Sequence, residues 1–124
     1  MSGFLIGQIR DSVPYFYASQ KKGTLVFQHH GDLAFTVDTG FTGSICIPAQ
    51  LLRKLDVELV DYGSFRLATG KTVELPIYWG KVKIHNKNFE TWFVPGDPLV
   101  GMEFLSSFGS QLQLLFKQKL LLLK

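Results

Sequence analysis

The chain has 124 residues, a length that suits a single domain with its own hydrophobic core. The expected domain covers residues 1–124. Hydrophobic residues make up 46% of it and aromatic residues 14%, which is enough apolar material for a packed, β-rich fold. The net charge of +3 comes from basic residues dispersed along the sequence, so we do not expect a nucleic-acid partner.

The only cysteine, Cys46, cannot form an internal disulfide, and its neighbours Ile45 and Ile47 predict a buried, inert thiol. The first residues lack the basic region and the long apolar region of a signal peptide. No apolar run approaches the length needed to cross a membrane. These features predict a cytoplasmic protein without a membrane partner.

Short apolar segments separated by turn residues follow one another along the chain. Leu33, Phe35 and Val37 alternate with their neighbours, so one face of that strand is expected to point into the core. Pro14 favours an edge position for the strand that contains it. The expected strands cover residues 3–9, 13–17, 24–28, 33–37, 44–48, 64–68, 71–75, 78–84, 88–94, 111–116 and 119–123, and the expected helices cover residues 48–55 and 102–108. This pattern predicts an all-β, closed or partly closed barrel with one or two short helices.

The most informative stretch is the apolar strand that runs into Asp38-Thr39-Gly40. Gly40 allows a tight turn, Thr39 supplies a hydroxyl that can hold the turn, and the Asp38 carboxylate is left facing a cleft. An aspartic peptidase needs this arrangement. The alternative is an aspartate that only caps a junction between a strand and a turn.

Two later segments strengthen the first interpretation. Leu99-Val100-Gly101 places two apolar residues before a glycine, and Ala68-Thr69-Gly70-Lys71 has the composition of a hairpin tip. Taken alone, the first is an ordinary buried strand with a bend, and the second is an ordinary turn.

Together these motifs resemble those of the retropepsin-like aspartic proteases of clan AA, over residues 4–123. The chain is most similar to the small prokaryotic and cellular single-domain members. The resemblance implies a retropepsin-like barrel with a flap hairpin above the cleft, and the activity of an aspartic endopeptidase. It implies catalytic roles for Asp38, Thr39 and Gly40, and substrate-binding roles for Phe41, Thr42, Ala68, Thr69, Gly70 and Leu99.

An aspartic peptidase uses two carboxylates that share one proton. This sequence has a single Asp-Thr-Gly, and Asp97, followed by Pro98, resembles a loop residue. The second carboxylate is therefore expected to be Asp38 of another copy, because a two-fold axis brings identical residues together. The expected partners are a second copy of the chain and an extended peptide or protein substrate.

Two positions depart from the retroviral pattern. Phe41 stands where retroviral enzymes carry Ala or Ser, and its side chain cannot hydrogen-bond the outer carboxylate oxygen. Met102 and Thr42 stand where those enzymes carry an Arg–Asp ion pair, which cellular relatives also lack. These departures motivate a second hypothesis, a dimeric peptide-binding or scaffold module with the same fold and little or no turnover.

No metal or other cofactor is expected. His29 and His30 are adjacent and point in opposite directions on a strand end, and no Cys or Glu cluster completes a ligand shell. A basic barrel that binds nucleic acid is a third and weaker hypothesis.

Overall fold

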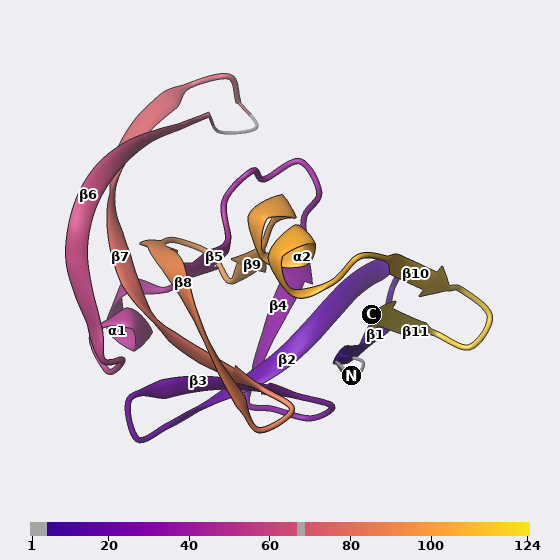
Figure 1. Ribbon diagram of the computed structural model, residues 1–124. Helices are drawn as coiled ribbons and strands as arrows, with labels where there is room; N and C mark the ends of the chain where they lie inside the picture. The colour runs from indigo at the N-terminus through magenta and orange to yellow at the C-terminus, as the bar shows by residue number, and fades with distance from the viewer. Residues whose placement is uncertain (1–4, 67–68) are drawn as a thin grey trace.

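The computed structural model describes residues 5–66 and 69–124, and strand accounts for 59% of this part of the chain. In chain order the elements are β1 (Leu5–Arg10), β2 (Val13–Lys21), β3 (Thr24–Gln28), β4 (Leu33–Val37), β5 (Ile45–Ile47), α1 (Ala49–Leu52), β6 (Val57–Arg66), β7 (Thr72–Ile84), β8 (Lys87–Pro95), β9 (Leu99–Val100), α2 (Met102–Phe108), β10 (Leu112–Leu115) and β11 (Leu120–Leu123). They form one mostly-β domain with two short helices (Figure 1).

Seven strands form a ring in the order β2, β3, β7, β8, β5, β9 and β4, and pairing between β4 and β2 closes it. The expected mostly-β class is confirmed, and the strands close into a ring, although this ring is not a regular barrel. Two of its strands, β5 and β9, have only three and two residues. The pairs β3–β7, β4–β9 and β5–β8 are parallel, whereas the others are antiparallel, so the hydrogen-bonding pattern changes around the ring.

A three-stranded extension leaves the ring at β2. There β1 pairs with β2 on one edge and with β11 on the other, and β11 in turn pairs with β10. Both ends of the described chain therefore lie on the same side of the molecule (Figure 1).

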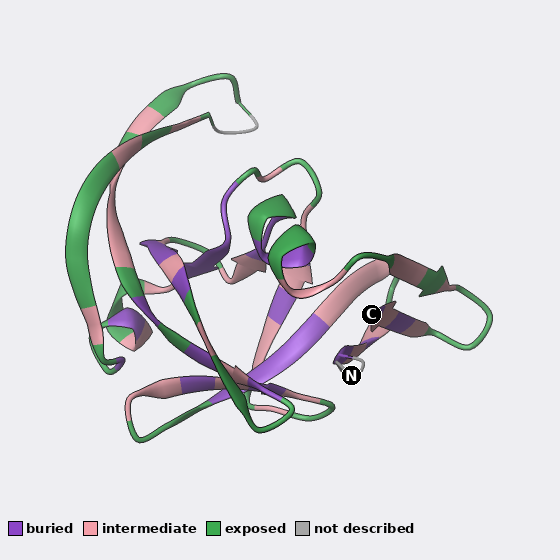
Figure 2. Cartoon of the chain, viewed as in Figure 1, coloured by how far each residue is buried: buried purple, intermediate pink, exposed green. Residues whose placement is uncertain are grey.

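The hairpin of β6 and β7 projects from the ring as a long, curved arm (Figure 1). Within the described residues β6 pairs only with β7, and most of its side chains are exposed (Figure 2). The sequence predicted this hairpin only at its outer end, over residues 64–68 and 71–75. The inner half of β6 was missed because its side chains face solvent and show no alternation of buried and exposed positions.

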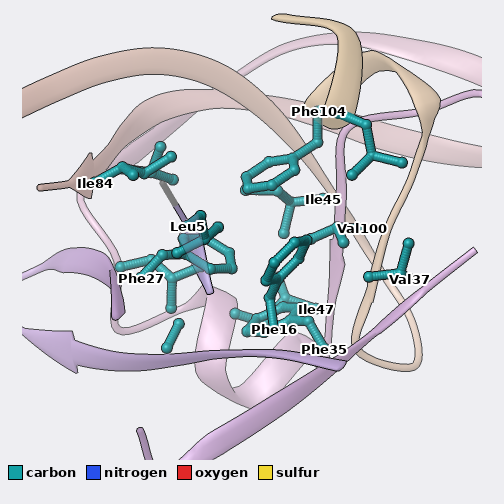
Figure 3. Packing of buried hydrophobic residues seen from close by; sticks show 14 of the residues in the cluster. Leu5, Phe16, Phe27, Phe35, Val37, Ile45, Ile47, Ile84, Val100 and Phe104 are labelled. Carbon is teal, nitrogen blue, oxygen red and sulfur yellow. The ribbon is translucent and has the colours of Figure 1, made fainter. Parts of the chain in front are cut away.

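Large aromatic side chains fill the ring. Phe16, Phe27, Phe35, Phe93 and Phe104 are each at most 2% exposed. The Phe27 ring lies 5.3 Å from that of Phe35 and 5.0 Å from that of Phe104, so the core joins β3, β4 and α2 (Figure 3). Such ring pairs add about 0.5–1.5 kcal/mol each beyond the burial of their area. This core fixes the end of β4, where Asp38 follows.

Two local predictions differ from the structure. The helix expected over residues 48–55 covers only Ala49–Leu52, because the chain turns after it and the Asp56 N–H donates to the Gly23 carbonyl at 2.8 Å. Pro14 does not lie on an edge strand, since β2 pairs on both sides. It pairs with Ile9 of β1, and the pairing with β4 ends one residue later at Tyr15, so its missing N–H interrupts no ladder.

The helix expected over residues 102–108 is confirmed with the same bounds as α2. In the part of the chain that the structure describes, neither helix has the length and apolar character that crossing a membrane requires.

Candidate active site

Asp38 follows directly after β4, which is held between β2 and β9. Its N–H donates to the Val100 carbonyl at 3.0 Å, so the backbone of the aspartate continues the pairing with β9. Its Oδ1 accepts a hydrogen bond from the Gly40 N–H at 2.9 Å, and its carbonyl accepts one from the Phe41 N–H at 3.1 Å. The half-buried carboxylate is therefore fixed within its own turn.

The segment Leu99–Val100 lies between the two strands that enter and leave this turn. It forms β9, which pairs in parallel with β4 and antiparallel with β5. The turn after Asp38 and the segment Leu99–Val100 are about sixty residues apart in the sequence, and the folding of the chain brings them into contact.

The turn after Asp38 also receives the start of α2. The N–H groups of Gly101, Met102 and Glu103 donate to the carbonyls of Ser44, Phe41 and Gly43, at 2.9, 2.8 and 3.1 Å respectively. The first N–H groups of a helix have no partner within the helix, and here the turn supplies the acceptors. The turn and α2 consequently stabilise one another.

Two glycines make space for the ring of Phe41. A Cβ on Gly101 would lie 2.6 Å from Cδ2 of Phe41 and 2.5 Å from its carbonyl oxygen, and a Cβ on Gly43 would lie 2.9 Å from Cε1 of the same ring. Real Cβ atoms do not approach so closely. At Gly101 the crowding atoms include backbone carbonyl oxygens, so this position requires glycine, whereas at Gly43 the crowding atom is the Phe41 ring. The ring of Phe41 is thereby held across the backbone of Gly43 and Gly101.

Below the turn, the polar groups are satisfied and buried. The hydroxyls of Ser44 and Thr91 lie 2.5 Å apart and join the turn to β8.

Cys46 is a free, buried thiol, as predicted. Burial, followed by the negative charge of Asp97, raises the pKa of Cys46 to about 11. Asp97 itself is an exposed turn residue between β8 and β9.

The remaining predicted site residues lie at different depths. Thr39, Gly40 and Thr42 are exposed, Phe41 is half-buried, and Leu99 is half-buried on β9. Thr69 and Gly70 are exposed at the end of the arm, and Gly70 has a φ of +88° with open space around it. Ala68 lies outside the described residues. No side chain within residues 5–66 and 69–124 hydrogen-bonds to the Asp38 carboxylate, which agrees with the departure noted at Phe41.

A shallow, mainly apolar hollow of about 600 Å³ lies beside the turn. Thr39 forms one part of its wall, and Met102 and Leu105 of α2 and Leu112 of β10 form others. Met102 is 43% exposed, so its apolar side chain is accessible in the wall of the hollow.

An aromatic bridge that the sequence did not predict joins the arm to the turn. The Phe65 ring of β6 lies 6.1 Å from the ring of Phe41 and 6.1 Å from that of Trp92 on β8. Phe65 and Trp92 lie in strands that the sequence predicted, over residues 64–68 and 88–94. Nothing local to the sequence, however, shows that the arm bends far enough for Phe65 to meet Phe41.

No group of three metal-binding side chains occurs among the described residues, and His29 and His30 are exposed in a turn.

A larger hollow of about 1020 Å³ lies along β3, β6, β7 and β8. Its charged side chains are Lys21, Lys22, Asp56, Glu58, Lys81, Lys83 and Glu90. The opposite charges largely cancel, so this hollow has no strong attraction for a polyanion.

No family model matches the chain, and no curated protein or solved structure matches it significantly.

Proposed function

We propose that the chain is a retropepsin-like aspartic endopeptidase, active as a homodimer in which each copy contributes Asp38. The observation that carries this proposal is the insertion of β9 between β4 and β5, which joins the Asp38 turn to Gly101 and the start of α2. A carboxylate at the end of a buried strand, in a turn held by a second distant segment, is pre-organised for catalysis.

The chemistry follows from two carboxylates that share a proton. The ionised one takes a proton from a water held between them, and that water attacks the scissile carbonyl carbon. The protonated one donates its proton to the carbonyl oxygen. The roles then reverse as the amine leaves, so the pair returns to its starting state, and its titration belongs to the pair rather than to one residue.

The second carboxylate comes from a second copy in this proposal. Within residues 5–66 and 69–124, no hydrogen bond joins Asp38 to another acidic side chain. The apolar hollow next to Thr39, with the exposed Met102 in its wall, supports a partner surface at the same place. A two-fold axis passing close to Thr39 would bury this hollow and bring the two Asp38 side chains together.

The test is a diverse peptide library incubated with purified protein at several pH values, with the products identified by mass spectrometry. We expect the wild type to cleave and Asp38→Asn to lose about a thousandfold in rate, because asparagine can neither accept nor donate the shared proton. Asp97→Asn is the matched control, since it removes an exposed carboxylate near the second motif, and it should cleave normally. Full activity in Asp38→Asn would refute the proposal.

Dilution tests the dimer separately. If the site forms only between two copies, specific activity rises with protein concentration until the dimer is saturated. A specific activity that stays constant down to concentrations at which sedimentation shows only monomer would contradict a shared site.

A second candidate function is a dimeric peptide-binding or scaffold module with little turnover. The favouring observation is that Phe41 has no hydroxyl to offer the carboxylate, and that Oδ1 of Asp38 is bonded only within its own turn among the described residues. This candidate predicts peptide binding that survives in Asp38→Asn, together with no cleavage by the wild type. Turnover therefore separates the two functions, whereas dimerisation does not.

A further inference from the structure

We infer that Phe41, Phe65 and Trp92, the aromatic bridge, form the subsite that selects the substrate, and that it takes an aromatic side chain of an extended peptide next to the scissile bond. In this inference Phe65 is the specificity-determining residue. The inference rests on the proposed function, because it concerns the peptide bound at the same site.

The bridge is built from three separate elements. Phe41 comes from the turn after Asp38, Phe65 from the arm, and Trp92 from β8. Both ring contacts have a centroid distance of 6.1 Å, with an interplanar angle of 46° between Phe41 and Phe65 and of 35° between Phe65 and Trp92. All three side chains are half-buried. Aromatic rings attract one another at centroid distances of about 4.5–7 Å in tilted or offset arrangements. A partly exposed wall of this kind can accept one further ring without losing its own contacts.

The wall adjoins the proposed catalytic group at a fixed position. The Phe41 N–H donates to the Asp38 carbonyl at 3.1 Å, and the ring lies against the backbone of Gly43 and Gly101, where a Cβ would meet it. The backbone of Phe41 is therefore tied to Asp38 and to Met102, whose N–H donates to the Phe41 carbonyl at 2.8 Å. A substrate ring that packs against this wall is held close to the carboxylate, and the orientation of the bond to be cut is thereby restricted.

Phe65 brings in the arm. Apart from this contact the outer part of β6 is largely exposed, including Ser64 and Arg66 on either side of Phe65. The arm can pair with an extended peptide through its backbone, while Phe65 reads a side chain of that peptide. The departure at Phe41 thus gains a reason, since its ring contributes to recognition at a place where retroviral enzymes carry the small residues Ala or Ser.

The first test compares the cleavage profile of the wild type with that of Phe65→Leu. The quantity measured is kcat/KM for peptides that carry Phe or Tyr at the selected position, divided by kcat/KM for the same peptides carrying Leu there. We expect this ratio to fall by about three- to tenfold in the variant. Phe89→Leu is the matched control, because Phe89 also lies on a ring contact, 5.0 Å from Phe108, but away from the bridge. Its cleavage profile should equal that of the wild type.

The second test does not need turnover. The chain has two tryptophans, so Trp79→Phe leaves Trp92 as the only one, and this change combined with Asp38→Asn gives an inactive protein whose tryptophan fluorescence reports on the bridge. The probe is an uncharged eight-residue peptide with one central Phe, compared with the same peptide carrying Ala there. We expect a saturable change in Trp92 emission with the Phe peptide, and at least about tenfold weaker binding of the Ala peptide.

The outcomes separate the inference from the proposed function. Cleavage without an aromatic preference, unchanged by Phe65→Leu, overturns the inference and leaves the peptidase intact. No cleavage by the wild type, with a Trp92 response to the Phe peptide alone, refutes the peptidase and supports the subsite in a binding module. No cleavage and equal responses to both peptides overturn both.

Discussion

The turn that holds Asp38 and the arm of β6 and β7 are built in opposite ways. The turn lies on buried strands, and its carbonyls bind the first N–H groups of α2. The arm is a two-stranded hairpin whose β6 strand has no second partner among the described residues and carries exposed Leu59, Val60 and Tyr62. Isolated two-stranded hairpins are only marginally stable, whereas a segment packed on a core shares the stability of the whole domain.

This difference suggests a division of roles in the proposed enzyme. A proton-transfer site loses rate when its groups are displaced by a fraction of an ångström, so the carboxylate has to stand on the rigid part. A segment that closes over an extended peptide has to move, so it is drawn from the less stable part. Phe65 is the described ring that links the two regions, through its contact with Phe41.

The largest expected effect comes from breaking the core under the turn. Phe104 is fully buried and packs against Phe27 and Phe108, at 5.0 and 4.9 Å between ring centroids. Phe104→Ala should lower the free energy of unfolding by about 3–5 kcal/mol, because it removes buried area and leaves a cavity. Tyr62→Ala on the arm, 57% exposed, should change it by less than about 0.5 kcal/mol.

Urea denaturation of both variants measures this contrast. Equal losses of stability in the two would mean that the arm is as firmly integrated as the core. That result would remove the distinction between a rigid and a movable region.

A smaller effect is expected from two glycines that lie in the two regions. Gly101→Ala places a Cβ 2.5 Å from the Phe41 carbonyl oxygen, and this crowding should cost about 2–3 kcal/mol. Gly70→Ala has open space, but its φ of +88° should cost about 1 kcal/mol of backbone strain. Thermal melts give both values. A Gly101→Ala variant as stable as the wild type would show that the turn and α2 can separate freely.

Much of the rigid region could be predicted from sequence, because its signals are local. Alternation at Leu33, Phe35 and Val37 marks β4, the glycine after Asp38 marks the turn, and α2 has the predicted bounds over residues 102–108. The pairing of Leu99 and Val100 with both β4 and β5 was not predicted, since no local pattern encodes contacts between distant segments.

The movable region was predicted less well, for a related reason. The inner half of β6 has exposed side chains that give no pattern of burial, so the arm appeared shorter than it is. The contact of Phe65 with Phe41 and Trp92 depends on the curvature of the whole hairpin, which single residues do not specify. Pro14 was misplaced at an edge because its strand is paired on both sides except where the proline lies.

The smallest effect concerns pH and the base of the turn, where Cys46 of β5 pairs with Leu99 of β9. Burial raises the pKa of Cys46 from 9.0 to about 11 in the folded chain. Between these values the unfolded chain has lost the thiol proton and the folded chain has kept it, so stability falls as pH rises. The loss of stability should be about 1 kcal/mol near pH 10 and absent below about pH 8.

Urea denaturation at pH 8 and pH 10 should show this difference in the wild type and a smaller one in Cys46→Val, which keeps an apolar side chain but has no proton to lose. Equal differences in the two proteins would place the alkaline sensitivity outside the turn.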